Sequence, residues 1–419
     1  MLDEKDIKFL NEHSASEADD LLLHSSRYPD IDIRGVVVQL KGRNSAMLKL
    51  PLWASTEGIL YPEHISIEQC SSERSARYKS DLVRRLVFAD KNSQNVVFAK
   101  STEQAITVTD LTGGFGVDAV MLALGFDRCR LTFVERNADL CELAGHNFPL
   151  LGVRNYEIVC CECEELLPSL PHQDIIFIDP ARRDIYGHKT VALSDCSPDV
   201  SRLNSVLLEK AGLVVVKMSP MLDMWHAIGQ LSGLGQVHIV SVDGECKELL
   251  AVMSNKWKVS DENDIVVFCV NIVKDQMSVM KFRLEELRSA IPSFAKSVHH
   301  YLYEPNASVM KCNAANALSV RCDMEKLHPN SQLLTSDKLI ESFPGRVFEV
   351  VSTYGFSKSD LKVLTSSVKK ANLTVRNFPL SVGDLRKRFK IKEGGDDYLF
   401  ATTLCDNSRV IILCRKIKL

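Results

Sequence analysis

The chain has 419 residues, of which 45% are hydrophobic and 25% charged, and its formal net charge is −3 at pH 7. These values are typical of a soluble globular protein with roughly two to four domains. No apolar run approaches the ~18 residues that cross a bilayer, and no apolar signal segment follows the charged N-terminus. The composition therefore excludes a transmembrane protein and predicts a cytoplasmic one.

Residues 1–100 are predicted to form a mostly helical N-terminal region. Apolar residues recur at helical spacing over residues 3–27 and again over 71–90. Between these helices, Ile33–Leu40 and Ala46–Pro51 are predicted to be extended.

Residues 101–255 alternate apolar strands with helical stretches, which predicts parallel pairing through βαβ crossovers. Only the segment Asp243-Gly-Glu-Cys-Lys247 separates the last two strands, so these should form an antiparallel hairpin. That segment is either a polar tight turn or a rim of the functional site. The predicted strands are Ile106–Thr109, Arg130–Val134, Glu157–Cys160, Asp174–Ile178, Leu213–Lys217, Val237–Val242 and Glu248–Met253.

A glycine turn follows the first of these strands. Residues 106–118 read Ile-Thr-Val-Thr-Asp-Leu-Thr-Gly-Gly-Phe-Gly-Val-Asp, so the strand ends at Asp110 and a helix follows the turn. Gly113, Gly114 and Gly116 lack the Cβ atoms that would block a ligand, and glycine takes positive φ without steric cost. The turn predicts a binding site for a nucleoside cofactor. It resembles the first cofactor-binding motif of class I S-adenosylmethionine (AdoMet) methyltransferases.

Carboxylates at the ends of the first two strands favour AdoMet over NAD. In methyltransferases an acid at the place of Asp110 helps to hold the methionine part of AdoMet, whose ammonium has the opposite charge. Glu135 ends the next strand and can accept hydrogen bonds from both ribose hydroxyls. Thr112 lies in the turn between them and is a further candidate contact. The G-x-G-x-x-G pattern of dinucleotide sites is absent.

Other candidate cofactor contacts flank this turn. Glu162 follows the third strand and can meet the adenine amino group, with two neighbouring glutamates as alternatives. Asp118, at the start of the helix, either caps its first amides or helps to position the amino-acid part of the cofactor. Before the helix predicted over 71–90, Gln69 or Ser72 can reach the cofactor, while Ser71 or Ser72 can instead cap that helix.

The fourth predicted strand ends in Asp179-Pro180-Ala-Arg182-Arg183. Ligands of doubly wound sheets bind beyond the carboxyl ends of the strands, and amino-group methyltransferases carry Asn/Asp-Pro-Pro-aromatic at this place. The chain keeps Asp179-Pro180 and replaces the second proline and the aromatic residue. Asp179 can orient an acceptor amine, and Arg182 and Arg183 can meet phosphate or stack on a base.

The reaction is predicted to be a direct in-line transfer. Pyrimidine-C5 methyltransferases need a cysteine nucleophile near the fourth or fifth strand, and the sequence has none at these strand ends, the second of which reads Lys217-Met-Ser-Pro220. Transfer to nitrogen or oxygen mainly needs positioning and a polar acceptor for the departing proton.

The 13 cysteines have no framework spacing and are expected to be reduced. The run Cys160-Cys-Glu-Cys163 contains one CxxC pair, but a structural zinc site usually needs a second pair of ligands. Cysteines at the end of a buried strand are the alternative, and no metal is predicted.

The pattern of predicted strands and helices changes after residue 255. A strand over Ile265–Val273 and a helix over Arg283–Arg288 predict a small α+β domain over residues 256–335, and a third region covers 343–419. Residues 345–419 contain 15 Lys and Arg but seven Asp and Glu, so their formal charge is +8 and the rest of the chain carries −11.

A basic end on an acidic body favours a polyanion partner, with RNA as the obvious one. An ordinary solvated surface is the alternative explanation of this charge. The residues expected to contact RNA phosphates are Arg376, Arg386, Lys387, Arg388 and Lys390.

The chain resembles the bacterial class I AdoMet-dependent methyltransferases that carry a THUMP-like C-terminal domain. The resemblance implies an α/β fold with a Rossmann-like seven-stranded sheet whose last strand is antiparallel, and an N-terminal helical region. It also implies a ferredoxin-like α+β domain and a THUMP-like domain, and THUMP domains bind structured RNA, especially tRNA. It rests on the segments 68–73, 110–118, 178–184, 241–249, 303–308, 343–348, 376–380 and 394–401.

These features predict an AdoMet-dependent methyltransferase that acts by direct transfer on a base nitrogen of tRNA or rRNA. Two other functions stay open: a non-catalytic RNA-binding protein that uses the methyltransferase fold as a scaffold, and a small-molecule methyltransferase.

Overall fold

The computed structural model divides into two compact units. The first unit contains Met1–Gly235 and Leu249–Val259, and the second contains Gln236–Glu248 and Ser260–Leu419. Among the described residues, no helix is both long and apolar enough to cross a membrane. The structure describes residues 3–62, 64–88, 104–182, 193–257 and 261–418.

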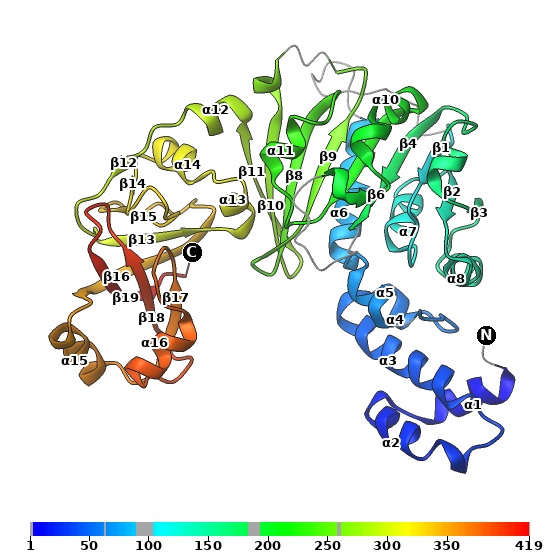
Figure 1. The fold of residues 1–419 in the computed structure, drawn as a ribbon, viewed down its shortest axis with the longest axis horizontal. Helices are drawn as coiled ribbons and strands as arrows, with labels where there is room; N and C mark the ends of the chain where they lie inside the picture. The colour runs from blue at the N-terminus through cyan, green and yellow to red at the C-terminus, as the bar shows by residue number, and fades with distance from the viewer. Residues whose placement is uncertain (1–2, 63, 89–103, 183–192, 258–260, 419) are drawn as a thin grey trace. The chain divides into compact units, whose positions relative to one another are not determined.

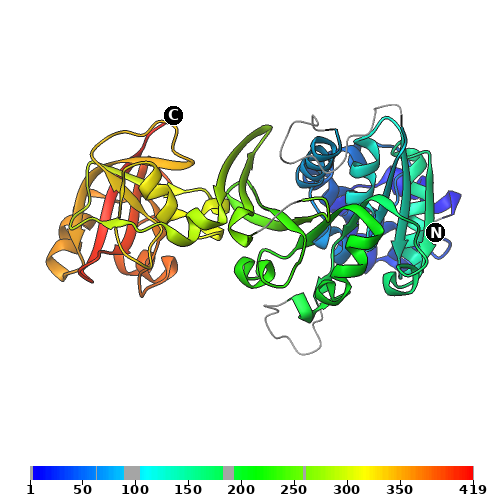
Figure 2. The same ribbon diagram turned by 90° about the horizontal axis from the view of Figure 1, so that it is seen from above.

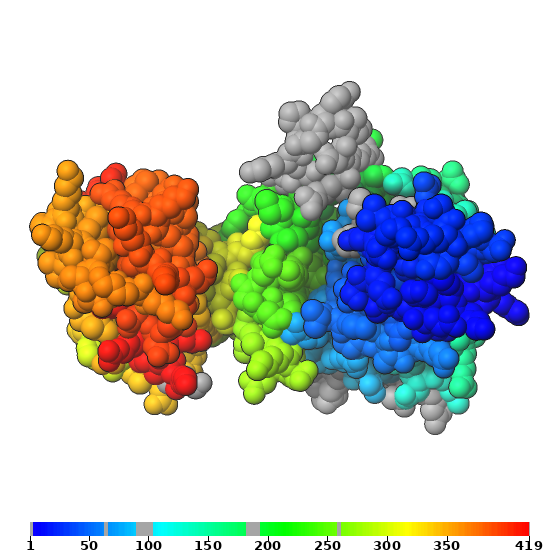
Figure 3. Space-filling view, turned by 90° about the horizontal axis from the view of Figure 1, so that it is seen from below, coloured from blue at the N-terminus to red at the C-terminus, as the bar shows by residue number. Residues whose placement is uncertain are grey.

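The first unit begins with helices, as predicted, and in the space-filling view they form one continuous surface (blue in Figures 1 and 3). Asn147 of a later helix joins this region to the rest of the unit, since it exchanges two hydrogen bonds with the backbone of Leu60 (2.8 and 3.0 Å). The helices are α1 (Glu4–Glu12), α2 (Ala18–Leu23), α3 (Ile33–Lys49), α4 (Pro51–Ser55), α5 (His64–Gln69) and α6 (Glu73–Val87).

The prediction of extended segments over Ile33–Leu40 and Ala46–Pro51 was wrong, because α3 is one continuous helix. Its N-cap is Asp32, whose carboxylate accepts a hydrogen bond from the Gly35 N–H group. The β-branched residues that favoured a strand are spaced three and four apart and therefore share one helical face. That face is buried against α2 and consists of Ile33, Val36, Val37 and Leu40.

All seven predicted strands are present, each close to its expected limits. β9 runs antiparallel to β7, whereas β1 pairs in parallel with β2 and β4. The turn Asp243–Gly244 joins β8 to β9 with positive φ at both residues, as a two-residue hairpin requires. The strands are β1 (Ile106–Asp110), β2 (Cys129–Glu135), β3 (Tyr156–Cys160), β4 (Gln173–Ile178), β7 (Ala211–Met218), β8 (Leu234–Val242) and β9 (Glu245–Met253).

Two further strands extend this sheet, which runs in the order β11-β10-β8-β9-β7-β4-β1-β2-β3. β10 (Val266–Val273) pairs in parallel with β8, and β11 (Gln276–Arg283) pairs with β10. Helices α7 (Val117–Leu124), α8 (Ala138–Leu150) and α10 (Val200–Lys210) pack against strands of the sheet (Figures 1 and 2). The shorter α9 (Cys163–Leu166) and α11 (Met224–Ile228) also lie between strands along the chain.

Most of the second unit is a separate sheet in the order β12-β14-β15-β13-β16-β19-β18-β17. Apolar clusters that include Leu385 with Ile411, and Phe348 with Phe400, form its cores. Its elements are α12 (Leu284–Ser289), β12 (Ser293–Phe294), β13 (Tyr301–Pro305), α13 (Ala307–Lys311), α14 (Ala315–Arg321), β14 (Glu325–Lys326), β15 (Leu334–Ser336), β16 (Gly345–Gly355), α15 (Lys358–Ser367), β17 (Asn372–Val375), α16 (Val382–Phe389), β18 (Asp397–Thr403) and β19 (Arg409–Lys416).

Candidate functional site

The glycine turn between β1 and α7 has a backbone conformation that requires its glycines. A Cβ atom on Gly113 would lie 2.1 Å from the buried ring of Phe133, so only glycine fits there. Gly114 and Gly116 have φ values of +56° and +82°, in the left-handed region that favours glycine. Gly113 and Gly116 thus let the turn pack closely on Phe133 and Phe148, and only at Gly114 would a side chain point into open space.

Glu135 at the end of β2 is bound to this turn. Its Oε2 accepts a hydrogen bond from the Gly114 N–H group (2.8 Å), and its Oε1 accepts one from the Asn137 N–H group (2.9 Å). Carboxylate oxygens can accept more than one hydrogen bond. Glu135 can therefore also accept hydrogen bonds from ligand hydroxyl groups.

Asp110 lies below the turn and is 1% exposed. Its Oδ1 accepts a hydrogen bond from the Thr112 N–H group (3.0 Å). Burial raises the pKa of Asp110 well above its usual value; the Thr112 bond opposes this, and the charges of Asp118, Asp179 and Glu135 add to it.

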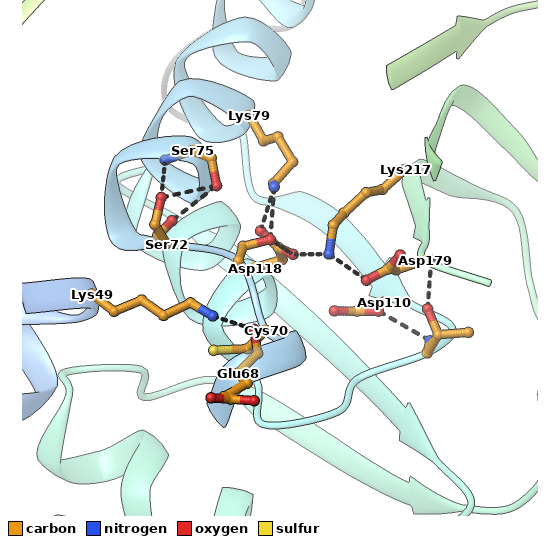
Figure 4. Close-up of polar contacts among 12 residues, drawn as sticks. Lys49, Glu68, Cys70, Ser72, Ser75, Lys79, Asp110, Asp118, Asp179 and Lys217 are labelled. Atoms are coloured by element: carbon orange, nitrogen blue, oxygen red, sulfur yellow. Dashed lines mark hydrogen bonds and ion pairs between the residues drawn. The ribbon is translucent and has the colours of Figure 1, made fainter. Parts of the chain in front are cut away.

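Asp118, in the first turn of α7, belongs to a buried network with residues of the N-terminal region (Figure 4). Lys79 on α6 is fully buried and ion-pairs with Asp118 Oδ1 (3.0 Å). The Ser71 hydroxyl donates to Asp118 Oδ2 (2.7 Å) and accepts from Lys79 (2.9 Å). Burial acts to raise the pKa of Asp118, but Lys79, Lys217 and the Ser71 hydrogen bond hold it below its usual value.

Asp179 follows β4 and joins the same network. Lys217, near the end of β7, donates to Asp179 Oδ2 (2.5 Å) and lies 3.9 Å from Asp118 Oδ2. The Asp179 N–H group donates to Thr112 Oγ1 (2.6 Å), which ties the end of β4 to the glycine turn. Asp110, Asp118, Asp179 and Lys217 therefore gather at one edge of the sheet (Figure 4).

Ser71, Lys79 and Lys217 were not predicted as site residues. Lys217 had a usable signal, since it is a lysine that follows the apolar run Leu213–Val216. Lys79 had none, because its neighbours along α6 include Arg77 and Asp81, which are typical of a solvated helix.

Other predicted cofactor residues lie apart from this network. Gln69 is exposed at the end of α5. Ser72 is the N-cap of α6 and accepts from the Ser75 N–H group (3.3 Å). Glu162 is exposed and forms an ion pair with Arg136 (3.3 Å).

The segment after Asp179 continues into a short ribbon. Pro180 is buried, and Arg182 lies on β5 (Ala181–Arg182), which pairs with β6 (Cys196–Ser197). Arg183 lies outside the described residues. The ribbon pairs Arg182 with Cys196, a buried cysteine that the sequence did not place near the end of β4.

Three of the five basic residues predicted to contact RNA have partners within the second unit. Arg376 ion-pairs with the buried Glu304 (2.8 Å), and Arg386 with Glu393 (3.2 Å). The Arg388 guanidinium lies over the ring of Phe356 (4.5 Å). Lys387 and Lys390, the other two, are exposed on or beside α16.

The cysteines near the end of β3 are free thiols. Burial raises the pKa of Cys163, which disfavours the thiolate that a metal ion would need. Among the residues that the structure describes, no group of three or more His, Cys, Asp or Glu side chains could hold a metal ion.

The side chains and the backbone around the glycine turn fit AdoMet. A buried carboxylate, Asp110, can pair with the cofactor ammonium, and Glu135 can accept from the ribose hydroxyls. Gly114 leaves open space, since a Cβ atom there would meet only Thr112 O at 3.9 Å.

Two family models match the second unit: a ferredoxin-like domain over residues 301–344 and a "THUMP domain-like" region over 345–416. The first match begins later than the domain boundary predicted at residue 256.

A solved structure described as "putative methyltransferase from Porphyromonas gingivalis W83" aligns over 100% of both chains, with 32% identity and a TM-score of 0.83. TrmN from Thermus thermophilus aligns over 42% of this chain and 48% of its own (15% identity, TM-score 0.31). A SAM-dependent methyltransferase from Agrobacterium tumefaciens aligns over 44% and 62% (15% identity, TM-score 0.31). No curated protein sequence matched.

Proposed function

The chain belongs to the family of class I methyltransferases that carry ferredoxin-like and THUMP-like C-terminal domains, and we propose that it transfers the methyl group of AdoMet to a base nitrogen of tRNA or rRNA. The observation that carries the cofactor part is the buried Asp110 beneath a turn that only glycine can form. The RNA part is supported by the THUMP domain-like match, which covers nearly the same residues as the segment with a charge of +8.

The side chains around the turn indicate the cofactor contacts: Asp110 would bind the ammonium and Glu135 the ribose hydroxyls. Glu162 stays the candidate from the sequence for the adenine amino group. When bound, AdoMet supplies a methyl group on a positively charged sulfur atom.

Asp179 then orients the acceptor. Among the described residues its Oδ2 is held by Lys217, so Oδ1 is available to accept an N–H group of the substrate. Pro180 has a fixed φ and holds the backbone after Asp179 in one conformation. Arg182 and Arg183 supply positive charge for a substrate phosphate.

We propose a role for Asp118 that differs from both roles predicted from the sequence. Its carboxylate is already bound to Ser71, Lys79 and Lys217. We propose that it anchors α7 and the glycine turn to α6 rather than contacting the cofactor.

Two measurements test the function. Calorimetric titration of the pure protein with AdoMet and S-adenosylhomocysteine should show binding of both, and binding of neither would refute an AdoMet enzyme. Mass spectrometry of nucleosides from tRNA and rRNA of cells with and without the gene should then show one methylated nucleoside that depends on the gene. Unchanged nucleosides beside intact cofactor binding would refute the RNA substrate.

A further inference from the structure

The charges around the glycine turn are distributed unevenly. Lys79, Asp118, Lys217 and Asp179 alternate in sign along the network in Figure 4, with separations of 3.0, 3.9 and 2.5 Å between neighbouring charged atoms. These four charges sum to zero. Asp110 is buried, but among the described residues its carboxylate has no cationic partner in an ion pair and accepts only the Thr112 N–H group.

The charges that raise the pKa of Asp110 come from Asp118 on α7, Asp179 after β4 and Glu135 at the end of β2. The nearby cation Lys217 binds Asp179 and Asp118. Burial of a carboxylate without a counterion favours its protonated form. A ligand ammonium that enters this place supplies the missing counterion and favours the ionised form.

This inference rests on the proposed cofactor. We propose that Lys79 and Lys217 are positioning residues: they pair with Asp118 and Asp179, which leaves the Asp110 carboxyl group to bind the cofactor ammonium. Cofactor binding then releases the Asp110 carboxyl proton to solvent. Charge balances in this step, because one ammonium replaces one proton beside the same carboxylate. No redox partner or further group takes part.

Proton release makes the affinity depend on pH. While Asp110 is protonated in the free protein, each unit of rising pH should tighten binding about tenfold, which corresponds to ~1.4 kcal/mol. The gain ends once the pH exceeds the raised pKa of Asp110. A ligand without an ammonium should show no such dependence.

The test compares two ligands by calorimetry at pH 6, where α-amino groups are charged. S-adenosylhomocysteine carries the amino-acid part, whereas 5′-methylthioadenosine keeps the nucleoside and the sulfur but lacks the ammonium. Repeating each titration in buffers of different ionisation enthalpy counts the protons released. We expect net proton release, of up to one proton per ligand, for S-adenosylhomocysteine and none for 5′-methylthioadenosine.

Variants extend the comparison. Asp110→Asn should lose the proton release and weaken S-adenosylhomocysteine binding at least tenfold, while Asp127→Asn, in an exposed turn, should match the wild type. Lys217→Met should move the affinity profile to higher pH, because Asp118 and Asp179 lose their shared ammonium, and Lys217→Arg should restore it.

The outcomes separate the two proposals. Equal proton counts for the two ligands in the wild type would overturn the proton-coupled site and leave AdoMet binding intact, even if Asp110→Asn does not fold. An unchanged pH profile in Lys217→Met would overturn the role of Lys217. Binding of neither ligand by the wild type would refute the proposed cofactor and this inference with it.

Discussion

Gly113→Ala tests the glycine turn directly. The new Cβ atom would lie 2.1 and 2.2 Å from Cε2 and Cζ of Phe133, whereas ordinary contacts begin near 3.4 Å. One group must therefore move by more than 1 Å. Phe133 is fully buried and packs edge-on against Phe148 (5.1 Å between ring centroids), so it has little room to move. Overpacking of this kind costs about 1–3 kcal/mol.

This cost should appear in both stability and binding. For a unit of this size about 1–3 kcal/mol lowers the melting temperature by about 3–10 °C. A displaced turn also moves the Gly114 N–H group away from Glu135, so AdoMet affinity should fall at least tenfold (~1.4 kcal/mol). Urea unfolding gives the free energy of unfolding, thermal unfolding gives the melting temperature, and calorimetric titration with AdoMet gives the affinity.

Two further variants make the test specific. Gly145→Ala is the control: its Cβ atom would meet Ile158 at an ordinary 3.6 Å inside α8, where alanine stabilises a helix by about 0.5–1 kcal/mol. The second variant is Phe133→Leu, because leucine lacks the two Phe133 atoms nearest to the new Cβ. This substitution should lower the free energy of unfolding less in the Gly113→Ala protein than in the wild type. A Gly113→Ala protein with wild-type stability and affinity would refute the packing argument.

Four other predictions follow from the site. Asp179→Ala should abolish methyl transfer to RNA while AdoMet affinity stays within about tenfold, and loss of cofactor binding would show that its role is misassigned. Cys196→Ser should keep transfer, whereas its loss would indicate covalent catalysis. Replacing Lys387 and Lys390 by glutamine should make the affinity for tRNA fall less steeply with salt, by about 0.7–0.9 in the log–log slope for each RNA phosphate that is no longer neutralised. The raised pKa of Asp110 means that its ionisation is unfavourable in the folded protein. The free energy of unfolding of Asp110→Asn, measured with urea, should therefore exceed that of the wild type by an amount that grows as pH rises from 3.8 through that pKa. Below pH 3.8 this difference should not appear.

The strands could be predicted from sequence because their signals are local. The central strand β7 is an apolar run from Leu213 to Val216, and Asp243–Gly244 has the residues of a tight hairpin turn. Asp110, Glu135 and Asp179 could be placed for a related reason. Each ends or follows a strand, and parallel strands bring such ends to one edge of the sheet.

The counterions could not be predicted in the same way. Lys79 and Ser71 reach Asp118 from about 40 residues earlier in the chain, through the packing of α6 on α7, which no local pattern encodes. The error at α3 had a different cause. β-branched residues at Ile33 and Val36–Val37 fit a strand by propensity, but tertiary burial of one helical face decided the outcome.

The charges at the turn also bear on which class of cofactor we propose. A helix that begins after a glycine turn can bind a pyrophosphate at its N-terminus, as in dinucleotide sites. Here Asp118 occupies the first turn of α7, and Asp110 lies buried beneath the glycines with Glu135 beside them. Lys79 and Lys217 are engaged with Asp118 and Asp179, so neither lysine is left to pair with a phosphate on this turn. The same arrangement would attract a ligand with an ammonium and a positively charged sulfur atom, which supports the proposal that the site binds AdoMet and not NAD.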